Sequence, residues 1–322
     1  MNLGFSKLSW LLMERFRRSG LIISAVLLLV FTVYCFWGAR PENFSEVLRA
    51  WHGKGHIALL AFATGVVGIW IDMFAWNCAW RSQGVRLPLR TAIPLYYSGL
   101  ALQLLPLQLC RITRIALAFR SGTATLRQAL TAESLSLGLD LLALLNVLLA
   151  FVLPWPYKWV AFGTGLVTGP VAVVVADRFR GLIARRFKHL TDYSFATPYS
   201  LATYYGRILD WISVSLVLYL VASVTIPGVR FETCGATALG ASILGAASAL
   251  PGGLGVNEAI LAVGIGQGQN AELLLERSTT VFVYRLLTFW MWIPVGWWGL
   301  ITFRKRAIAT RRTAAPRGAP DA

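Results

Sequence analysis

The chain has 322 residues, of which 57% are hydrophobic and 14% charged, and its mean hydropathy is +0.62. This composition excludes a disordered protein, a small secreted disulfide scaffold and most soluble enzymes, and it predicts an integral membrane protein. The 30 Lys and Arg residues outnumber the 14 Asp and Glu and give a formal net charge of +16, which in a membrane chain sets orientation rather than predicting a nucleic-acid partner.

Apolar runs of membrane-crossing length recur along the chain, and a bilayer core needs about 20 such residues per helix. We expect full spans at residues 21–38, 57–77, 126–153, 157–177, 199–222 and 279–302. Two other apolar stretches, 91–120 and 235–266, are interrupted by Pro106 and by the glycine-rich segment that starts at Pro251. Because proline removes a backbone donor and glycines loosen the backbone, each stretch is predicted to be a re-entrant or broken helical hairpin.

The basic residues divide unequally between the two sides of this arrangement. With the N-terminus inside, 22 Lys and Arg residues lie on the inner side, in segments 7–18, 81–90, 111–127, 178–188 and 304–317. Six lie outside: Arg40, Arg49, Lys54, Lys158, Arg230 and Arg277. This bias follows the positive-inside rule and predicts a multi-pass membrane protein with both termini cytoplasmic.

The order of elements repeats as span, span, hairpin, span. Each repeat makes three crossings, so the second half, about residues 157–302, should be inverted relative to the first, about residues 21–153. Inverted repeats are typical of transporters that bind substrate between broken helices at the midplane. We therefore expect an all-α fold with one membrane domain over residues 1–302 and a basic, disordered tail over residues 303–322.

Charged groups inside the spans cost roughly 2.5 to 3.5 kcal/mol each on insertion scales, so each needs a reason. Glu133 and Asp140 share one helix face with Ser136, since seven residues make about two turns. That face should point into the bundle or a cavity. Arg207 and Asp210 lie three residues apart and can form an ion pair on one helix. The alternative is that such groups merely satisfy one another or reach the membrane surface.

The segment from Pro251 to Glu258 reads PGGLGVNE. Its glycines, Gly252, Gly253 and Gly255, permit backbone shapes in which N–H groups converge, and a helix starting near Val256 adds its positive end. Such a pocket can hold a phosphate or carboxylate at membrane depth. Glu258 is expected either to cap its own helix, to meet a cationic headgroup or to carry a proton.

This segment resembles the transmembrane, flippase-like region of the lysylphosphatidylglycerol synthase family, which carries PGGLGxxE. The family also has an arginine in its last span, matched by Arg285, and an acid-led motif after its first broken segment, where this chain has Glu133 followed by Ser134. Its first broken segment reads roughly P-x-x-x-G-D-x-x-R. Here Pro106 and Arg114 are kept, while Cys110 and Arg111 replace the glycine and aspartate.

The resemblance implies a location in the bacterial plasma membrane, and movement of an amphiphilic lipid between leaflets or participation in assembling lipid-linked products. In the transport hypothesis, Arg111 and Arg114 attract a lipid phosphate, since arginine donates paired hydrogen bonds, and Glu258 with Arg285 completes a polar path. One alternative is a membrane enzyme using Glu133 or Asp140 as base. Another is a non-catalytic partner of lipid-modifying enzymes.

Synthase activity is not expected, because the chain is interpreted as a stand-alone member without the aminoacyl-transfer domain. We predict membrane lipids as partners, and no cofactor, metal site or catalytic residue.

Overall fold

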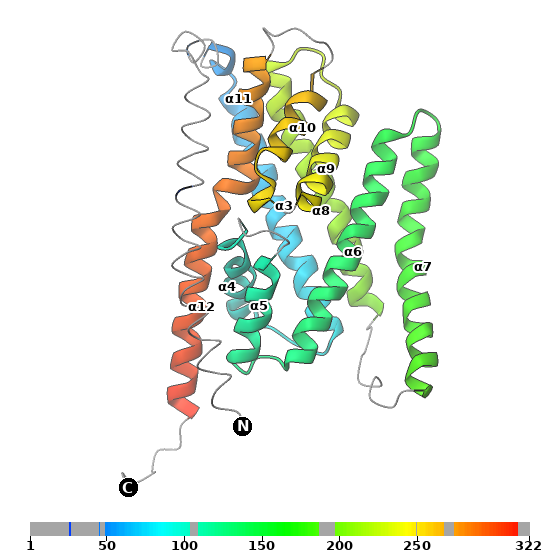
Figure 1. Ribbon diagram of the computed structural model, residues 1–322, viewed down its shortest axis with the longest axis vertical. Coiled ribbons are helices and arrows are strands. Elements are labelled where there is room, and N and C mark those ends of the chain that lie inside the picture. The colour runs from blue at the N-terminus through cyan, green and yellow to red at the C-terminus, as the bar shows by residue number, and fades with distance from the viewer. Residues whose placement is uncertain are drawn as a thin grey trace.

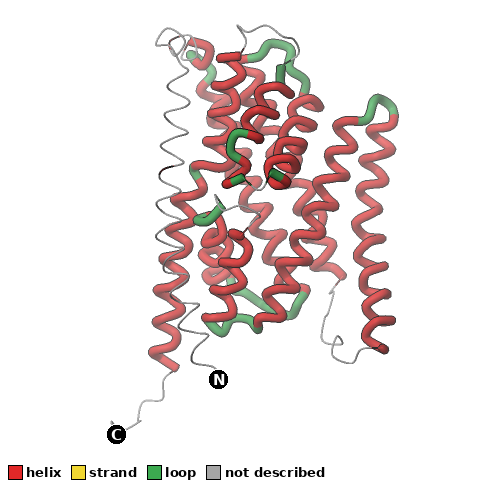
Figure 2. The backbone as a smooth tube through the Cα atoms, in the orientation of Figure 1, coloured by secondary structure: helices red, strands yellow, loops and turns green. Residues whose placement is uncertain are grey.

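The computed structural model describes residues 49–103, 109–186, 197–248, 250–266 and 274–314, together with residues 26 and 45. Within those ranges every regular element is a helix and no strand occurs. Loops gather at the two ends of the helix bundle and at mid-height (Figure 2). The all-helical membrane fold predicted from the composition is therefore confirmed.

Five helices or helix runs in the described chain are long and apolar enough to cross a membrane. They are α3 (Gly55–Ser82), α6 (Leu126–Val152), the Tyr157–Phe179 part of α7 (Tyr157–Arg186), the Pro198–Thr225 part of α8 (Thr197–Thr225), and Arg277–Arg306. This last run joins α11 (Leu274–Arg285), the five-residue π-helix η5 (Leu286–Trp290) and α12 (Trp292–Ala314). These five coincide with five of the six expected spans, and the remaining one, 21–38, lies outside the described residues.

Both interrupted stretches form paired short helices. The first consists of α4 (Leu89–Leu100) and α5 (Leu109–Arg120), which pack together; Pro106 lies outside the described residues. The second consists of α9 (Phe231–Ala247), a 3-10 turn at Pro251–Gly253 and α10 (Val256–Gly264). Figure 1 shows α4 and α5 in the lower half of the bundle, and α9 and α10 in the upper half. The breaks thus bring non-helical backbone to mid-height.

Helices α3 and α8 pack along each other at the centre of the bundle. Small residues allow this approach: a Cβ added to Gly206 would lie 2.8 Å from Ala75 Cβ, and Thr203 Oγ1 donates to the Ala75 carbonyl at 3.0 Å. Small residues and hydroxyl bonds are the usual means by which helices associate inside a membrane. The consequence is that charged residues of α3 and α8 face each other.

At the upper end, Lys158 at the start of α7 donates to Glu232 Oε1 of α9 at 2.9 Å, and Arg230 lies 3.7 Å from Glu232 Oε2. The Lys158 hydrogen bond holds the pKa of Glu232 below its usual range. A lowered acid pKa adds stability above the pKa of the unfolded chain, about 4.3, and that stability is lost as pH falls through the folded value.

We therefore predict that Lys158→Gln lowers the thermal unfolding midpoint at neutral pH and that its difference from the wild type shrinks as the pH falls below about 4. Thermal unfolding in detergent between about pH 3 and pH 7 measures this. A difference that grows on acidification would contradict the assignment.

Candidate functional site

Six ionic side chains meet in the interior, where α3, α5, α6 and α8 come together. Each of the six is between 3% and 20% exposed. We call this set the central cluster; it comprises three acids and three arginines, Asp72, Glu133, Asp140, Arg111, Arg114 and Arg207. Because the two signs are equal in number, the cluster is formally neutral, which is how buried charges are usually tolerated.

Glu133 of α6 is the most buried of these carboxylates. Its Oε1 accepts a hydrogen bond from Trp76 Nε1 at 2.6 Å and lies 3.1 Å from Arg114 Nε, and its Oε2 accepts one from Arg114 Nη2 at 3.2 Å. The guanidinium carbon of Arg114 also lies 5.4 Å from the ring centres of Trp76 and Tyr96, within cation–π range. Arg114 is thus held by a carboxylate and two aromatic faces.

Asp140 lies two turns further along α6 and accepts bonds from Arg111 Nη2 and Trp211 Nε1, each at 3.1 Å. Arg111 Nη1 also lies 3.5 Å from Glu133, so this arginine bridges the two acids of one helix face. The structure confirms that Glu133 and Asp140 share a face with Ser136 and that this face points into the bundle.

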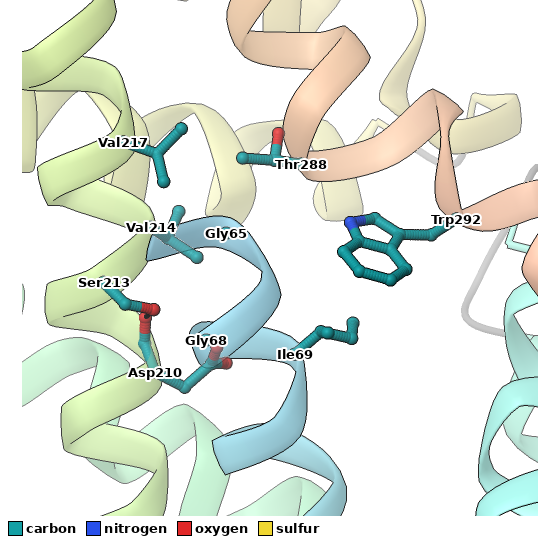
Figure 3. A pocket seen from close by; sticks show the side chains of 9 residues that line it. All are labelled: Gly65, Gly68, Ile69, Asp210, Ser213, Val214, Val217, Thr288 and Trp292. Carbon is teal, nitrogen blue, oxygen red and sulfur yellow. Dashed lines mark hydrogen bonds between the residues drawn. The ribbon is translucent and has the colours of Figure 1, made fainter. Parts of the chain in front are cut away.

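Arg207 of α8 binds Asp72 of α3 and donates to Ser136 Oγ at 3.0 Å. The Tyr96 hydroxyl also donates to Asp72. In the described chain the direct ion pair of Arg207 is with Asp72 rather than with the predicted Asp210: Arg207 is turned toward α3 and α6, where it also lies 3.8 Å from Asp140. Asp210, on the next turn of α8, points instead toward α3 at Gly68, as Figure 3 shows.

A second ionic group lies at the break between α9 and α10, which we call the loop cluster: Gly252, Gly255, Glu258 and Arg285. Arg285 Nε lies 2.8 Å from Glu258 Oε1, and Arg285 Nη2 donates to the Gly252 carbonyl at 3.0 Å. The Phe289 ring covers the guanidinium at 4.2 Å. This geometry joins the last span to the glycine-rich turn.

The glycines of this turn adopt backbone angles that other residues rarely reach. Gly252, Gly253 and Gly255 have φ of 59°, 67° and 80°, which is the left-handed region. Helix α10 begins at Val256, as expected, but Glu258 Oε2 accepts the Gly255 N–H at 2.7 Å. The anion position predicted at this helix start is therefore filled by the chain's own carboxylate, and Gly252 presents a carbonyl oxygen to a cation.

A cavity of about 50 Å³ lies between the two clusters. Figure 3 shows that its walls come from three elements: α3, α8 and the last span. They are Gly65, Gly68 and Ile69, then Asp210, Ser213, Val214 and Val217, and finally Thr288 and Trp292. The wall is mostly apolar, and Asp210 is its one ionisable side chain among the described residues.

Every candidate charge except Asp210 thus belongs to a cluster. The sequence prediction did not include the aromatic donors Trp76, Tyr96 and Trp211. A signal exists for Trp76, which follows Asp72 by one helical turn and therefore shares its face. Tyr96 and Trp211 carry no comparable signal, because a tyrosine or tryptophan in an apolar run is equally at home facing lipid.

The family described as "Lysylphosphatidylglycerol synthase TM region" matches residues 19–296, which include both clusters and the cavity. The chain belongs to this family. Searches of curated proteins and of solved structures found no match. In this member of the family, the PGGLGVNE segment is the turn whose carbonyl and acid hold Arg285. The first broken segment supplies Arg111 and Arg114 to the central cluster.

Proposed function

We propose that this chain moves an amphiphilic, phosphate-containing lipid between the two leaflets of a membrane. The observation that carries the proposal is the pair of buried arginine–carboxylate clusters at the breaks of two helix pairs. Charged groups at membrane depth that face a bundle interior usually mark a path for substrates or ions. The family to which the chain belongs is named for a lipid synthase, which supports a lipid as the substrate.

The proposed placement in the membrane follows from charge. Basic residues gather at the lower end of the bundle, where α3 and α12 end, as with Arg81 and Arg304 (Figure 1). By the positive-inside rule this end faces the cytoplasm, and we assign the chain to the bacterial inner membrane with both termini inside. The two helix pairs then enter from opposite leaflets as re-entrant hairpins of an inverted repeat.

The proposed chemistry is an exchange of partners. Arg111 and Arg114 now bind Glu133 and Asp140, and a lipid phosphate entering from the inner leaflet would take over part of those bonds. A headgroup that also carries an amine returns a cation to the released acid, so the interior stays neutral. The same exchange at Arg285 and Glu258 would pass the headgroup toward the outer leaflet.

The enzyme alternative fits the contacts less well. A general base needs a carboxylate that can accept a proton from substrate. Glu133 accepts bonds from Trp76 and Arg114, and Asp140 accepts bonds from Arg111 and Trp211. These donors already occupy positions on the carboxylate oxygens at which a substrate proton would be received, which supports transport as the first proposal.

The test is lipid movement by the purified chain in liposomes, followed with a fluorescent phospholipid and a membrane-impermeant quencher. Glu258→Gln and Arg285→Gln should each slow movement about 10- to 100-fold, the effect of losing a charged hydrogen bond of about 1.5–3 kcal/mol. Glu232→Gln and Arg178→Gln are matched controls away from both clusters and should move lipid at the wild-type rate.

Thermal unfolding of the same variants checks that they fold. Well-folded Glu258→Gln and Arg285→Gln proteins that move lipid as fast as the wild type would remove these residues from the path. A wild-type protein that moves no lipid would favour the non-catalytic partner, whose function does not depend on the buried polar groups.

A further inference from the structure

The cavity between the clusters holds an acid that the transport proposal leaves unused. Asp210 is partly buried, and among the described residues no hydrogen bond or ion pair reaches its carboxylate; Ser213 Oγ donates to its backbone carbonyl, at 2.7 Å. The nearest arginine in sequence, Arg207, is engaged with Asp72 and Ser136. An ionised carboxylate in a mostly apolar cavity, without a direct ion-pair partner, is costly, so a bound cation or a proton would stabilise it.

The place of the cavity is defined by all three elements that line it. On α8, the lining residue Asp210 follows Arg207 of the central cluster by three residues. On α3, the lining residue Gly68 precedes Asp72 of the same cluster by four. In the last span, the lining residue Thr288 follows Arg285 of the loop cluster by three. Each wall therefore lies about one helical turn from a charged cluster. The cavity occupies the interval between the central cluster and the loop cluster, on the same interior path.

We propose that Asp210 is a proton-binding site and that its protonation controls the movement of lipid between the clusters. Proton binding at Asp210 stands independently of the proposed function, whereas the control of lipid movement rests on it. The proton comes from water, adds to a carboxylate oxygen and returns to water; no other bond changes. With the proton bound, Arg207 stays on Asp72 and near Asp140; with the proton released, the Asp210 carboxylate on its own helix competes with these two acids for Arg207.

A proton fits this cavity better than a metal cation does. A sodium or calcium ion requires a shell of several oxygens, whereas most of the wall is Gly65, Ile69, Val214, Val217 and Trp292. Thr288 and Ser213 already donate to the carbonyls of Tyr284 and Asp210. A volume of about 50 Å³ has room for about three waters, enough to carry a proton to one carboxylate.

The charged and titratable groups around Asp210 come from its own helix and from α3, α4, α6 and α11. They are Arg207 on its own helix, Asp72 on α3, Asp140 on α6, Tyr96 on α4, and Tyr284 with Arg285 on α11. Arg207 and Arg285 are paired with Asp72 and Glu258, while Asp140 is paired with Arg111. Asp210 is the acid in this set that no ion pair among the described residues satisfies.

The first arm of the test is spectroscopic and needs no transport. Infrared spectra of the purified protein in lipid nanodiscs, recorded as a pH series, should show the C=O band of one protonated carboxylic acid in the wild type. Asp210→Asn should lose that band, while Asp177→Asn, a matched change on α7, should keep it. A band that survives in Asp210→Asn, or its absence from the wild type, would overturn the proton site.

A further variant tests whether protons reach Asp210 from water through this cavity. A Cβ on Gly65 would have its nearest neighbours at 3.7 and 3.9 Å, which is ordinary contact, so Gly65→Ala should fold while adding a methyl group to the cavity. Hydrogen–deuterium exchange of the Asp210 carboxyl should slow in this variant. An unchanged exchange rate would mean that the proton does not pass through this cavity, contradicting the proposal.

The second arm measures lipid movement in liposomes from about pH 5 to pH 9. On the limb where one proton controls the rate, the wild-type rate should change about tenfold per pH unit, and Asp210→Asn should be flat. A slope unchanged in Asp210→Asn, or a rate set by sodium rather than pH when sodium is exchanged for potassium, would overturn the control. If the wild type moves no lipid at any pH, the proposed function fails and the spectra still decide the proton site.

Discussion

Replacing Glu133 with glutamine is expected to lower the free energy of unfolding by about 3–5 kcal/mol, because it leaves a buried arginine without its counter-charge. Glu133 is 3% exposed and its main partner Arg114 is 7% exposed, so water cannot take over the lost interaction. Thermal and denaturant unfolding of the purified protein in one detergent measure the change.

Two further variants define the cause of that loss. Because the penalty arises from the arginine left behind, Glu133→Gln combined with Arg114→Gln should be less destabilised than the sum of the two single changes. Lys158→Gln breaks a pair whose side chains are 21% and 33% exposed, and it should cost at most about 1 kcal/mol. Equal losses for Glu133→Gln and Lys158→Gln, or strictly additive effects in the double variant, would show that burial does not set the cost.

Gly245→Ala is expected to destabilise the protein by about 1–3 kcal/mol through overpacking at the glycine-rich break. Gly245 lies in α9 where Asn257 of α10 packs against it, and a Cβ there would lie 1.9 Å from Asn257 Oδ1. Asn257 in turn donates to the Gly252 carbonyl at 3.3 Å, so the added methyl group would push α10 and the turn away from α9.

The matched control is in the same helix. A Cβ on Gly240 would meet nothing within 4 Å, so Gly240→Ala should be neutral or stabilise the helix by up to about 1 kcal/mol. Gly245→Ala combined with Asn257→Ala should recover part of the loss, because the second change removes the atoms in the way. Thermal unfolding in detergent again gives the comparison; no recovery in the double variant would place the strain elsewhere.

The positions of the helices were accessible from the sequence, because span length and the breaks near Pro106 and Pro251 are local properties. The inward face of α6 was also accessible, since Glu133 and Asp140 are two turns apart on one helix. The partner of Arg207 could not be predicted from the sequence. Whether Arg207 pairs with Asp210 or with Asp72 depends on how closely α3 approaches α8, and therefore on packing at Gly206.

A similar limit applies at the glycine-rich turn. The PGGLG segment predicted an unusual backbone and a helix start at Val256, and both are present. Sequence could not decide whether the turn would aim N–H groups or carbonyl oxygens at its centre. In the structure the Gly252 carbonyl faces Arg285, and Glu258 lies at the helix start. This arrangement is stable inside the bundle because the side chains of Arg285 and Glu258 neutralise each other.

The equal numbers of acids and arginines in the central cluster also determine how the protein responds to membrane voltage. Moving one elementary charge across a potential of 100 mV changes its energy by about 2.3 kcal/mol. Paired charges of opposite sign at the same depth experience opposite forces, which almost cancel. The membrane potential therefore exerts almost no net force on the central cluster, although the cluster contains six charged side chains. In the proposed transport, voltage would act on the net charge that the headgroup carries past the cluster.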